Sequence, residues 1–257
     1  MHCIFGGIYM RNLIVSDFDG TFSTSVKDIK LNCEKIFDFM SRGNYFLLSS
    51  GRPYDSLMEQ VKKYGIPYTY LATSDGSFLF DEKRNMIDSY VMPHDIVKEL
   101  DILLKHDIFD KVQYTYPKTN GNTYKEGALL ANVAFVINNK KITPSFIDDF
   151  EALKESHPDY DFTVYGYGDV SYYIVRAKGV NKGVIVQSLA DKVGVSTENI
   201  YTIGDNDNDF EMIRDYNGYM IGDNLGLVSV ALKRYNAVHE LVNDINKGKV
   251  LKRKFKE

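Results

Sequence analysis

The sequence is poor in the residues that mark specialised protein classes. Its 257 residues include no Trp, two Cys and six Pro, and 44% of them are apolar. These values exclude collagen-like, low-complexity and disordered chains and fit an ordinary globular protein. Cys3 and Cys33 lack the spacing of a metal site. We expect free thiols in a reducing compartment, with a single structural disulfide as the alternative.

Long apolar runs and an excess of positive charge are also missing. The longest uncharged run, between Glu126 and Lys140, contains several Asn and is far shorter than the roughly 20 apolar residues of a spanning helix. Arg11 follows the apolar start instead of preceding it, which is the wrong order for a signal peptide. The net charge of −4 disfavours a nucleic-acid binder. We therefore expect a cytoplasmic protein with no membrane or nucleic-acid partner.

The two ends of the chain have simple interpretations. Residues 1–9 could be a ragged extension ahead of a natural start at Met10. The tail, residues 247–257, is rich in Lys and Arg and could touch nucleic acid or membrane. A solvated, frayed end is the favoured interpretation of such a terminal charge run.

Strand and helix patterns alternate in the first and last parts of the chain. This alternation predicts an α/β fold with a Rossmann-like, doubly wound parallel sheet. The middle, residues 84–180, mixes two helical stretches, near 94–106 and 145–156, with longer strand patterns and predicts an inserted α+β cap domain. The core would then be discontinuous, formed by residues 1–83 and 181–257. Its expected strands are 12–16, 45–49, 69–72, 77–80, 200–203 and 217–221, and its expected helices are 28–42, 54–64, 182–193 and 207–214.

The strongest functional signal follows the first predicted strand. Asp17-Phe18-Asp19-Gly20-Thr21 places two carboxylates at positions i and i+2, on the same side of an extended backbone. They lie at the C-terminal edge of a parallel strand, where α/β folds bind ligands. Two close carboxylates repel, so they need a cation, or one of them must hold a proton. An ordinary surface turn is the alternative for this motif taken alone.

Three further segments carry polar groups in matching places. Ser49-Ser50-Gly51-Arg52 follows the second strand and could cradle an anion or cap a helix. Lys182 stands at a helix start, where a cation is unfavourable without a negative partner. Gly204-Asp205-Asn206-Asp207-Asn208-Asp209 offers the oxygen ligands of a hard cation, or an acidic helix start. A doubly wound sheet would gather all four segments at one edge.

Together the four segments resemble the signature of the haloacid dehalogenase superfamily, specifically its Cof-type branch with a large α/β cap. That family carries D-x-D-G-T, then T/S-G-R, then a Lys, then G-D-x-x-N-D. The resemblance runs from about Asn12 to Lys247, with Ser50 in place of the commoner Thr. Asn usually stands where this chain has Asp75, and that departure puts the role of this side chain in doubt.

The resemblance implies a Mg2+-dependent phosphatase of small phosphorylated metabolites, most plausibly sugar phosphates. Asp17 would be the nucleophile that forms an aspartyl-phosphate, and Asp19 the general acid and base. Asp17, Asp19 through its backbone carbonyl, and Asp205 would hold Mg2+, with Asp209 in support. The remaining expected site residues bind the phosphate or substrate: Ser50, Gly51, Arg52, Lys182 and Asn208.

Two other functions stay open at this point. The same site in a phosphomutase, such as a phosphomannomutase, would return the phosphoryl group to another hydroxyl of the substrate. A protein that binds a phosphometabolite without turnover is the second alternative, although the presence of both Asp17 and Asp19 argues against it.

Overall fold

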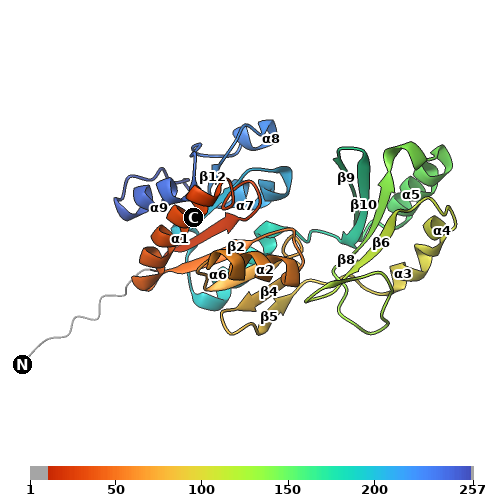
Figure 1. The fold of residues 1–257 in the computed structure, drawn as a ribbon, viewed down its shortest axis with the longest axis horizontal. Helices are drawn as coiled ribbons and strands as arrows, with labels where there is room; N and C mark the ends of the chain where they lie inside the picture. The colour runs from red at the N-terminus through yellow and green to blue at the C-terminus, as the bar shows by residue number, and fades with distance from the viewer. Residues whose placement is uncertain (1–10, 256–257) are drawn as a thin grey trace, which may run out of the picture.

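The computed structural model describes residues 11–255, and its strands form two separate sheets (Figure 1). In the larger, seven-stranded sheet the strands from β12 to β3 run parallel, and β4 and β5 add antiparallel at one edge. The prediction of a doubly wound parallel sheet is thereby confirmed. The order is β12 (Asn217–Met220), β11 (Ile200–Gly204), β1 (Leu13–Asp17), β2 (Tyr45–Ser49), β3 (Tyr70–Thr73), β4 (Phe78–Asp81) and β5 (Met86–Ser89).

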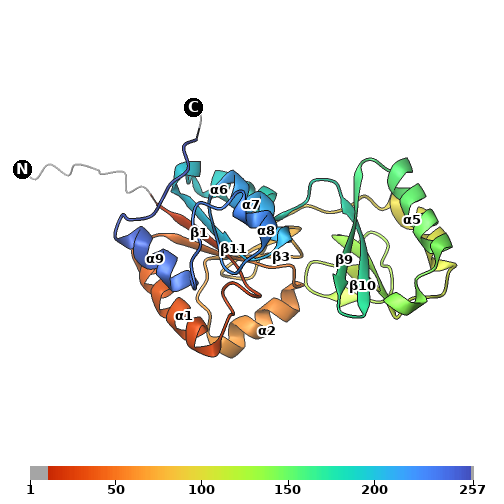
Figure 2. The ribbon, with the colours of Figure 1, turned by 90° about the horizontal axis from the view of Figure 1, so that it is seen from above.

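Helices cover both faces of this sheet (Figure 2). One face carries α1 (Val26–Ser41), α2 (Tyr54–Tyr64) and α9 (Val238–Asn246), and the other α6 (Lys182–Val193), α7 (Phe210–Asp215) and α8 (Leu225–Val228). Alternate side chains of β1 therefore enter different cores: Ile14 packs with the first group, and Leu13 and Val15 with the second. Burial on both faces explains why this strand is a continuous apolar run.

The smaller sheet has five strands, all antiparallel to their neighbours. One face packs against helices through a core of its own that includes Phe135, Phe146 and Phe150. The opposite face borders a pocket shared with the larger sheet. The strand order is β7 (Asn120–Gly121), β6 (Lys111–Thr115), β8 (Asn132–Asn138), β10 (Val170–Ala177) and β9 (Tyr160–Tyr167), and the helices are α3 (Asp95–Glu99), α4 (Asp101–Leu104) and α5 (Pro144–Ser156).

The first boundary between the sheets differs from the expected position at residue 84. Strand β5 pairs with β4, so the larger sheet extends as far as Ser89. Its sequence gave no strand pattern because its side chains are only partly buried, and Met86 is exposed. The division into a catalytic core and a cap stays a prediction, and the sheets place its first boundary after Ser89.

The basic tail is not frayed as far as the structure describes it, up to residue 255. The Arg253 guanidinium donates to the backbone oxygens of Tyr216, Ile213 and Val230, at 2.9, 3.2 and 2.6 Å. The frayed end expected for this segment is therefore wrong for Arg253, whose charge satisfies helix-end carbonyls. Residues 1–10 and 256–257 lie outside the described part, and with them the extension expected at residues 1–9. Within that part, no helix combines the length and apolar character needed to cross a bilayer.

Candidate active site

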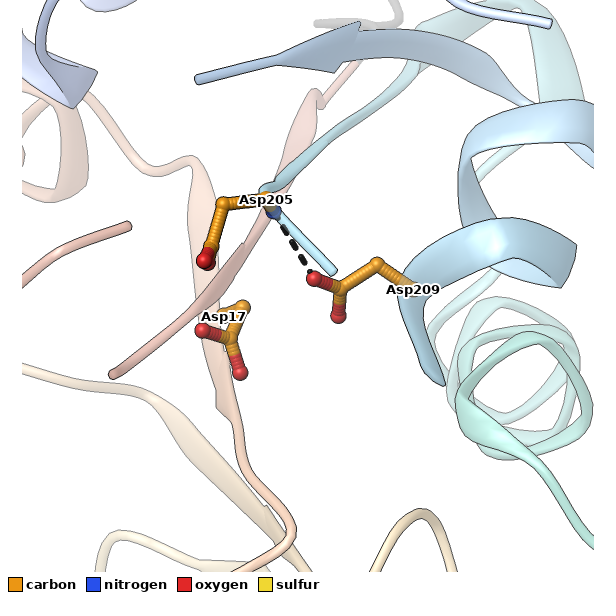
Figure 3. Close-up of side chains that lie close together, drawn as sticks. All are labelled: Asp17, Asp205 and Asp209. Carbon is orange, nitrogen blue, oxygen red and sulfur yellow. Dashed lines mark hydrogen bonds between the residues drawn. The ribbon is translucent and has the colours of Figure 1, made fainter. Parts of the chain in front are cut away.

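Three carboxylates converge where the parallel strands end (Figure 3). Asp17 is the last residue of β1, and Asp205 directly follows β11. Asp209 closes the 3-10 turn Asp207–Asp209 that leads into α7. Their ligand oxygens lie within 4.8 Å of one another. The prediction that the fold gathers these distant segments at one edge therefore agrees with the geometry.

Lys182 is the cation that this cluster surrounds. Its Nζ donates to Asp17 Oδ1 at 2.6 Å and to Asp209 Oδ1 at 2.7 Å. The lysine side chain and Asp209 are 0% exposed, and that of Asp17 is 7% exposed. A negative partner was expected for Lys182 because it stands at a helix start. The structure supplies two, the buried carboxylates of Asp17 and Asp209.

Short-range contacts hold the carboxylates in place. Asp209 Oδ2 accepts from the backbone N–H groups of Asp205 and Asn206 at 2.9 and 3.1 Å, which fixes the turn after β11. Thr21 donates its hydroxyl to Asp205. Gly20 has a φ of +79°, and a Cβ there would lie 2.3 Å from Asp205 Oδ2. The D-x-D-G-T segment therefore supplies a turn with room for the incoming carboxylate.

The electrostatics of the cluster show an excess of negative charge. Burial and the neighbouring Asp209 raise the pKa of Asp17, although Lys182 opposes the shift. Burial also raises the pKa of Asp205, against the hydrogen bond from Thr21. Burial by itself would lower the pKa of Lys182, but the Asp17 and Asp209 carboxylates outweigh it and raise that pKa. Lys182 is therefore held charged.

The donor set fits a divalent cation. Three carboxylates against one ammonium leave two negative charges in a mostly buried site. Burial raises the pKa values of Asp17 and Asp205, and repulsion from the Asp209 carboxylate adds to the shift. Carboxylate oxygens are the ligands that Mg2+ takes in proteins. Asp17, Asp205 and Asp209 could thus hold such an ion.

The Asp19 side chain is not part of this carboxylate cluster. It accepts two hydrogen bonds from Arg52, from Nε at 2.6 Å and from Nη2 at 2.7 Å. Its side chain is 53% exposed, and the guanidinium also lies over the ring of Phe18. The structure thus separates the two aspartates of the motif into a buried one and an accessible one. Arg52 was expected to contact the substrate, but in this structure its guanidinium group binds Asp19.

Of the other expected phosphate-binding residues, Gly51 and Asn208 line a pocket beside Asp19, whereas Ser50 is buried. Ser50 is 1% exposed, and its Oγ accepts from the backbone N–H of Arg52 at 3.1 Å. Asn208 donates from Nδ2 to Asp75 Oδ1 at 2.9 Å. Gly51 approaches the same carboxylate, since a Cβ there would lie 3.0 Å from Asp75 Oδ1. Asp75 therefore ties the loops after β2 and β11 together.

Sequence reasoning assigned no part to Thr21 or Asp75. Thr21 orients Asp205, and its place at the end of D-x-D-G-T was the available signal. Asp75 also faces the smaller sheet, where Arg176 Nη1 lies 3.8 Å from its Oδ2. The family usually has Asn at this position, so the sequence marked Asp75 as unusual. It did not indicate that Arg176 would be its partner.

Comparison with known proteins agrees with this geometry. The family model of the haloacid dehalogenase-like hydrolases matches residues 14–141 and 105–224. A candidate phosphatase of Buchnera aphidicola subsp. Baizongia pistaciae is 29% identical over 224 residues, covering 79% of this chain and 83% of the relative. The 5-amino-6-(5-phospho-D-ribitylamino)uracil phosphatase YitU of Bacillus subtilis is 26% identical over 255 residues, covering 89% and 93%.

A solved structure shows the same fold. A haloacid dehalogenase-like hydrolase from Bacteroides thetaiotaomicron superposes with a TM-score of 0.74 at 19% identity, over 91% of this chain and 99% of the other. The matched family covers more than half of the sequence and includes Asp17, Lys182, Asp205 and Asp209. The resemblance seen in the sequence is confirmed, as is its implication that the protein is an enzyme. The chain belongs to the haloacid dehalogenase-like hydrolases, in their Cof-type branch.

Proposed function

We propose that the chain is a cytoplasmic, Mg2+-dependent phosphatase that hydrolyses small phosphorylated metabolites, sugar phosphates among them. One observation carries this proposal. The buried carboxylate of Asp17 contacts the Lys182 ammonium at 2.6 Å and lies within 4.8 Å of two further carboxylates. A carboxylate held in this way is positioned as a nucleophile beside a site for a divalent cation.

Asp17 is the proposed nucleophile. One of its oxygens, Oδ1, is bound by Lys182, and the residue ends β1 at the edge of the sheet. Attack by a carboxylate oxygen on phosphorus would form an aspartyl-phosphate and release the alcohol. Lys182 would hold the carboxylate in position and neutralise phosphoryl charge as it shifts. Three carboxylates, Asp17, Asp205 and Asp209, would hold Mg2+ together with the Asp19 carbonyl, and the ion would supply positive charge for the phosphate.

Asp19 is the proposed general acid and base. Its exposed carboxylate, two residues beyond Asp17, borders the pocket where the alcohol would leave. In its protonated form Asp19 would give its proton to that oxygen, and the carboxylate so formed would then take a proton from the water that hydrolyses the aspartyl-phosphate. The two hydrogen bonds from Arg52 would fix the orientation of this carboxylate. Ser50, Gly51 and Asn208 would bind the phosphoryl oxygens.

The names of related proteins support this class of substrate. One relative of similar length acts on a phosphorylated ribitylamino-uracil, and a structure with a TM-score of 0.69 at 14% identity is titled as a sugar phosphatase. Both names describe phosphate monoesters of small metabolites. For this chain we propose the shared reaction, phosphate release from a small monoester, without assigning it the substrate of either protein.

A panel of phosphate monoesters, assayed with Mg2+ and with a chelator, tests the proposal. We expect phosphate release that requires Mg2+ and falls by at least about 10³-fold in Asp17→Asn, because the variant removes the nucleophile at nearly constant volume. Equal activity of the parent and Asp17→Asn would contradict it.

The same panel separates the alternatives left open by the sequence. A phosphomutase would convert one phosphate ester into another and release little free phosphate, which isotope tracing of the phosphoryl group would detect. A binding protein would be stabilised against heat by an ester that it does not hydrolyse. Either result would overturn the proposed phosphatase.

A further inference from the structure

A pocket of about 660 Å³ lies between the strand ends of the larger sheet and the open face of the smaller one. This volume is typical of a small-molecule site. Asp19 and Gly51, two proposed catalytic or phosphate-binding residues, border it, so under the proposed function it receives the leaving alcohol. The wall contributed by the smaller sheet consists of Tyr165, Tyr172 and Ile174.

The two tyrosines lie on the same face of the smaller sheet. Tyr165 on β9 pairs directly with Tyr172 on β10 in the antiparallel register, which places their side chains next to each other on one face. Tyr173 points to the opposite face and packs with Phe146 and Phe150 in the core beneath. Packing in that core therefore accounts for Tyr173, but not for the pair that faces the pocket.

A contact on the same face of the sheet orients Tyr165. Arg176 Nη2 donates to the Tyr165 hydroxyl at 3.0 Å, and its Nη1 lies 3.8 Å from Asp75 Oδ2. The arginine side chain is 12% exposed. Arg176 is thus a positioning residue that joins the aromatic wall to the loop containing Asp75.

The charges around the pocket are unfavourable for an anion. Its lining includes the carboxylates Asp19, Asp75 and Asp207, and Arg52 as its one cation among the residues that the structure describes. Arg52 is bound through two nitrogens to Asp19, and Arg176 faces Asp75. An anionic leaving group would meet the carboxylates of Asp75 and Asp207, while the guanidinium groups of Arg52 and Arg176 already contact a carboxylate each.

We infer that the pocket selects phosphate monoesters whose leaving alcohol is uncharged or cationic and presents a flat, apolar face to Tyr165 and Tyr172. Asp75 is the specificity-determining residue for charge, and the tyrosine pair is the determinant for shape. The inference rests on the proposed function, because it names the substrate class for the same site.

Charge selection is tested with benzyl phosphate and 4-carboxybenzyl phosphate, which share one ring and differ by one carboxylate. The parent should prefer benzyl phosphate in kcat/KM by about tenfold or more. Asp75→Asn should narrow this preference several-fold, because it removes the charge while an amide oxygen can still accept from Asn208. Equal use of both esters by the parent, or an unchanged preference in Asp75→Asn, would overturn the role of charge.

Shape selection is tested with benzyl phosphate and propyl phosphate, both esters of primary alcohols. Tyr172→Leu should lower the preference for benzyl phosphate by about tenfold, since stacking on an aromatic ring is lost. Tyr172→Phe keeps the ring and should retain the preference. A loss of equal size in both variants, or in neither, would overturn the role of the ring.

The same esters distinguish failure of the inference from failure of the proposed function. If the parent hydrolyses the esters without the expected order of preference, the proposed phosphatase activity is supported and the proposed substrate selection is wrong. If it hydrolyses none of them and matches Asp17→Asn, the proposed function falls, and the inference falls with it.

Discussion

Lys182 is fully buried, and its ammonium group bonds to two carboxylates on different elements, Asp17 and Asp209. Buried ion pairs of this kind are seldom net stabilising, but removal of one partner leaves charges uncompensated in a medium of low dielectric. The stability of this site therefore depends on one lysine, although the chain has 31 basic residues.

Lys182→Met keeps much of the side-chain volume and removes the charge. We expect the free energy of unfolding to fall by about 3–5 kcal/mol without added metal, because Asp17 and Asp209 are left buried and unpaired. Urea denaturation measures the change. Lys192→Met is the matched control on the same helix: Lys192 is 43% exposed and lies 3.2 Å from Asp88, so its loss should cost at most about 1 kcal/mol. Similar losses in the two variants would contradict the account.

The sequence predicted single residues well where the signal was local. Asp17, Asp205 and Lys182 each follow a strand or begin a helix within a short motif, so position and chemistry could both be read. Asp75 could not be assigned, because its partners Asn208 and Arg176 lie more than 100 residues away along the chain. Such contacts depend on how the two sheets face each other.

At the scale of elements, the turn between β3 and β4 supports the start of α6. Gly76 in this turn has a φ of +93°, and a Cβ there would lie 2.3 Å from the backbone oxygen of Asn181. Asn181 caps α6 by accepting from Val184 N, and Lys182 is the next residue. The turn thus packs against the helix end that carries the site's cation.

Gly76→Ala and Gly43→Ala form a matched pair that tests this packing. Gly43 also has a positive φ, of +84°, but a Cβ there would meet nothing within 4 Å. Gly43→Ala should therefore cost only backbone strain, about 1–2 kcal/mol, while Gly76→Ala should cost a further ~1–3 kcal/mol from the clash. Chemical denaturation of both variants gives the difference, and equal costs would show that the turn does not press on α6.

Element bounds followed the strength of the local pattern. The expected strand 45–49 and the helices 54–64 and 182–193 coincide with β2, α2 and α6. These elements alternate with clear turn or capping residues, such as Gly65 after α2. The expected helix 94–106 is split at Leu100 into α3 and α4. Partial exposure hid β5, because a half-buried edge strand lacks a continuous apolar run.

At the scale of the whole molecule, the site joins segments from both ends of the chain. Asp17 and Asp205 lie on β1 and after β11, which are neighbours in the sheet although nearly 190 residues separate them. A cation bound there therefore stabilises the folded chain as a whole, because the unfolded chain holds no such cluster.

Mg2+ should raise the melting temperature and the free energy of unfolding, by ~2.7 kcal/mol at about 100 times its Kd. Asp205→Asn should lose most of this effect, since it removes one ligand while an amide oxygen can still accept from Thr21. Calorimetry with NaCl at equal ionic strength serves as the control. The same stabilisation by NaCl, or by Mg2+ in Asp205→Asn, would show that the ion binds elsewhere.

The sequence predicted a parallel sheet with an inserted mixed domain, but it did not predict how the two sheets face each other. Strand–helix alternation indicates a parallel sheet through local periodicity alone. Which face of the smaller sheet covers the site depends on side chains that alternate along β10, where Tyr172 and Tyr173 point in opposite directions. Because both residues are tyrosines, the sequence pattern does not indicate which of them faces the pocket.

The central claim, that Asp17 is the nucleophile of a phosphatase, is tested most directly by trapping the intermediate. The enzyme is mixed with Mg2+ and a phosphate ester that it hydrolyses, and the reaction is quenched in acid. Reduction with borohydride then converts an aspartyl-phosphate into homoserine. Peptide mass spectrometry should find homoserine at Asp17, and only when ester and Mg2+ were both present. An actively hydrolysing enzyme that yields unmodified Asp17, or homoserine at another aspartate, would contradict the account.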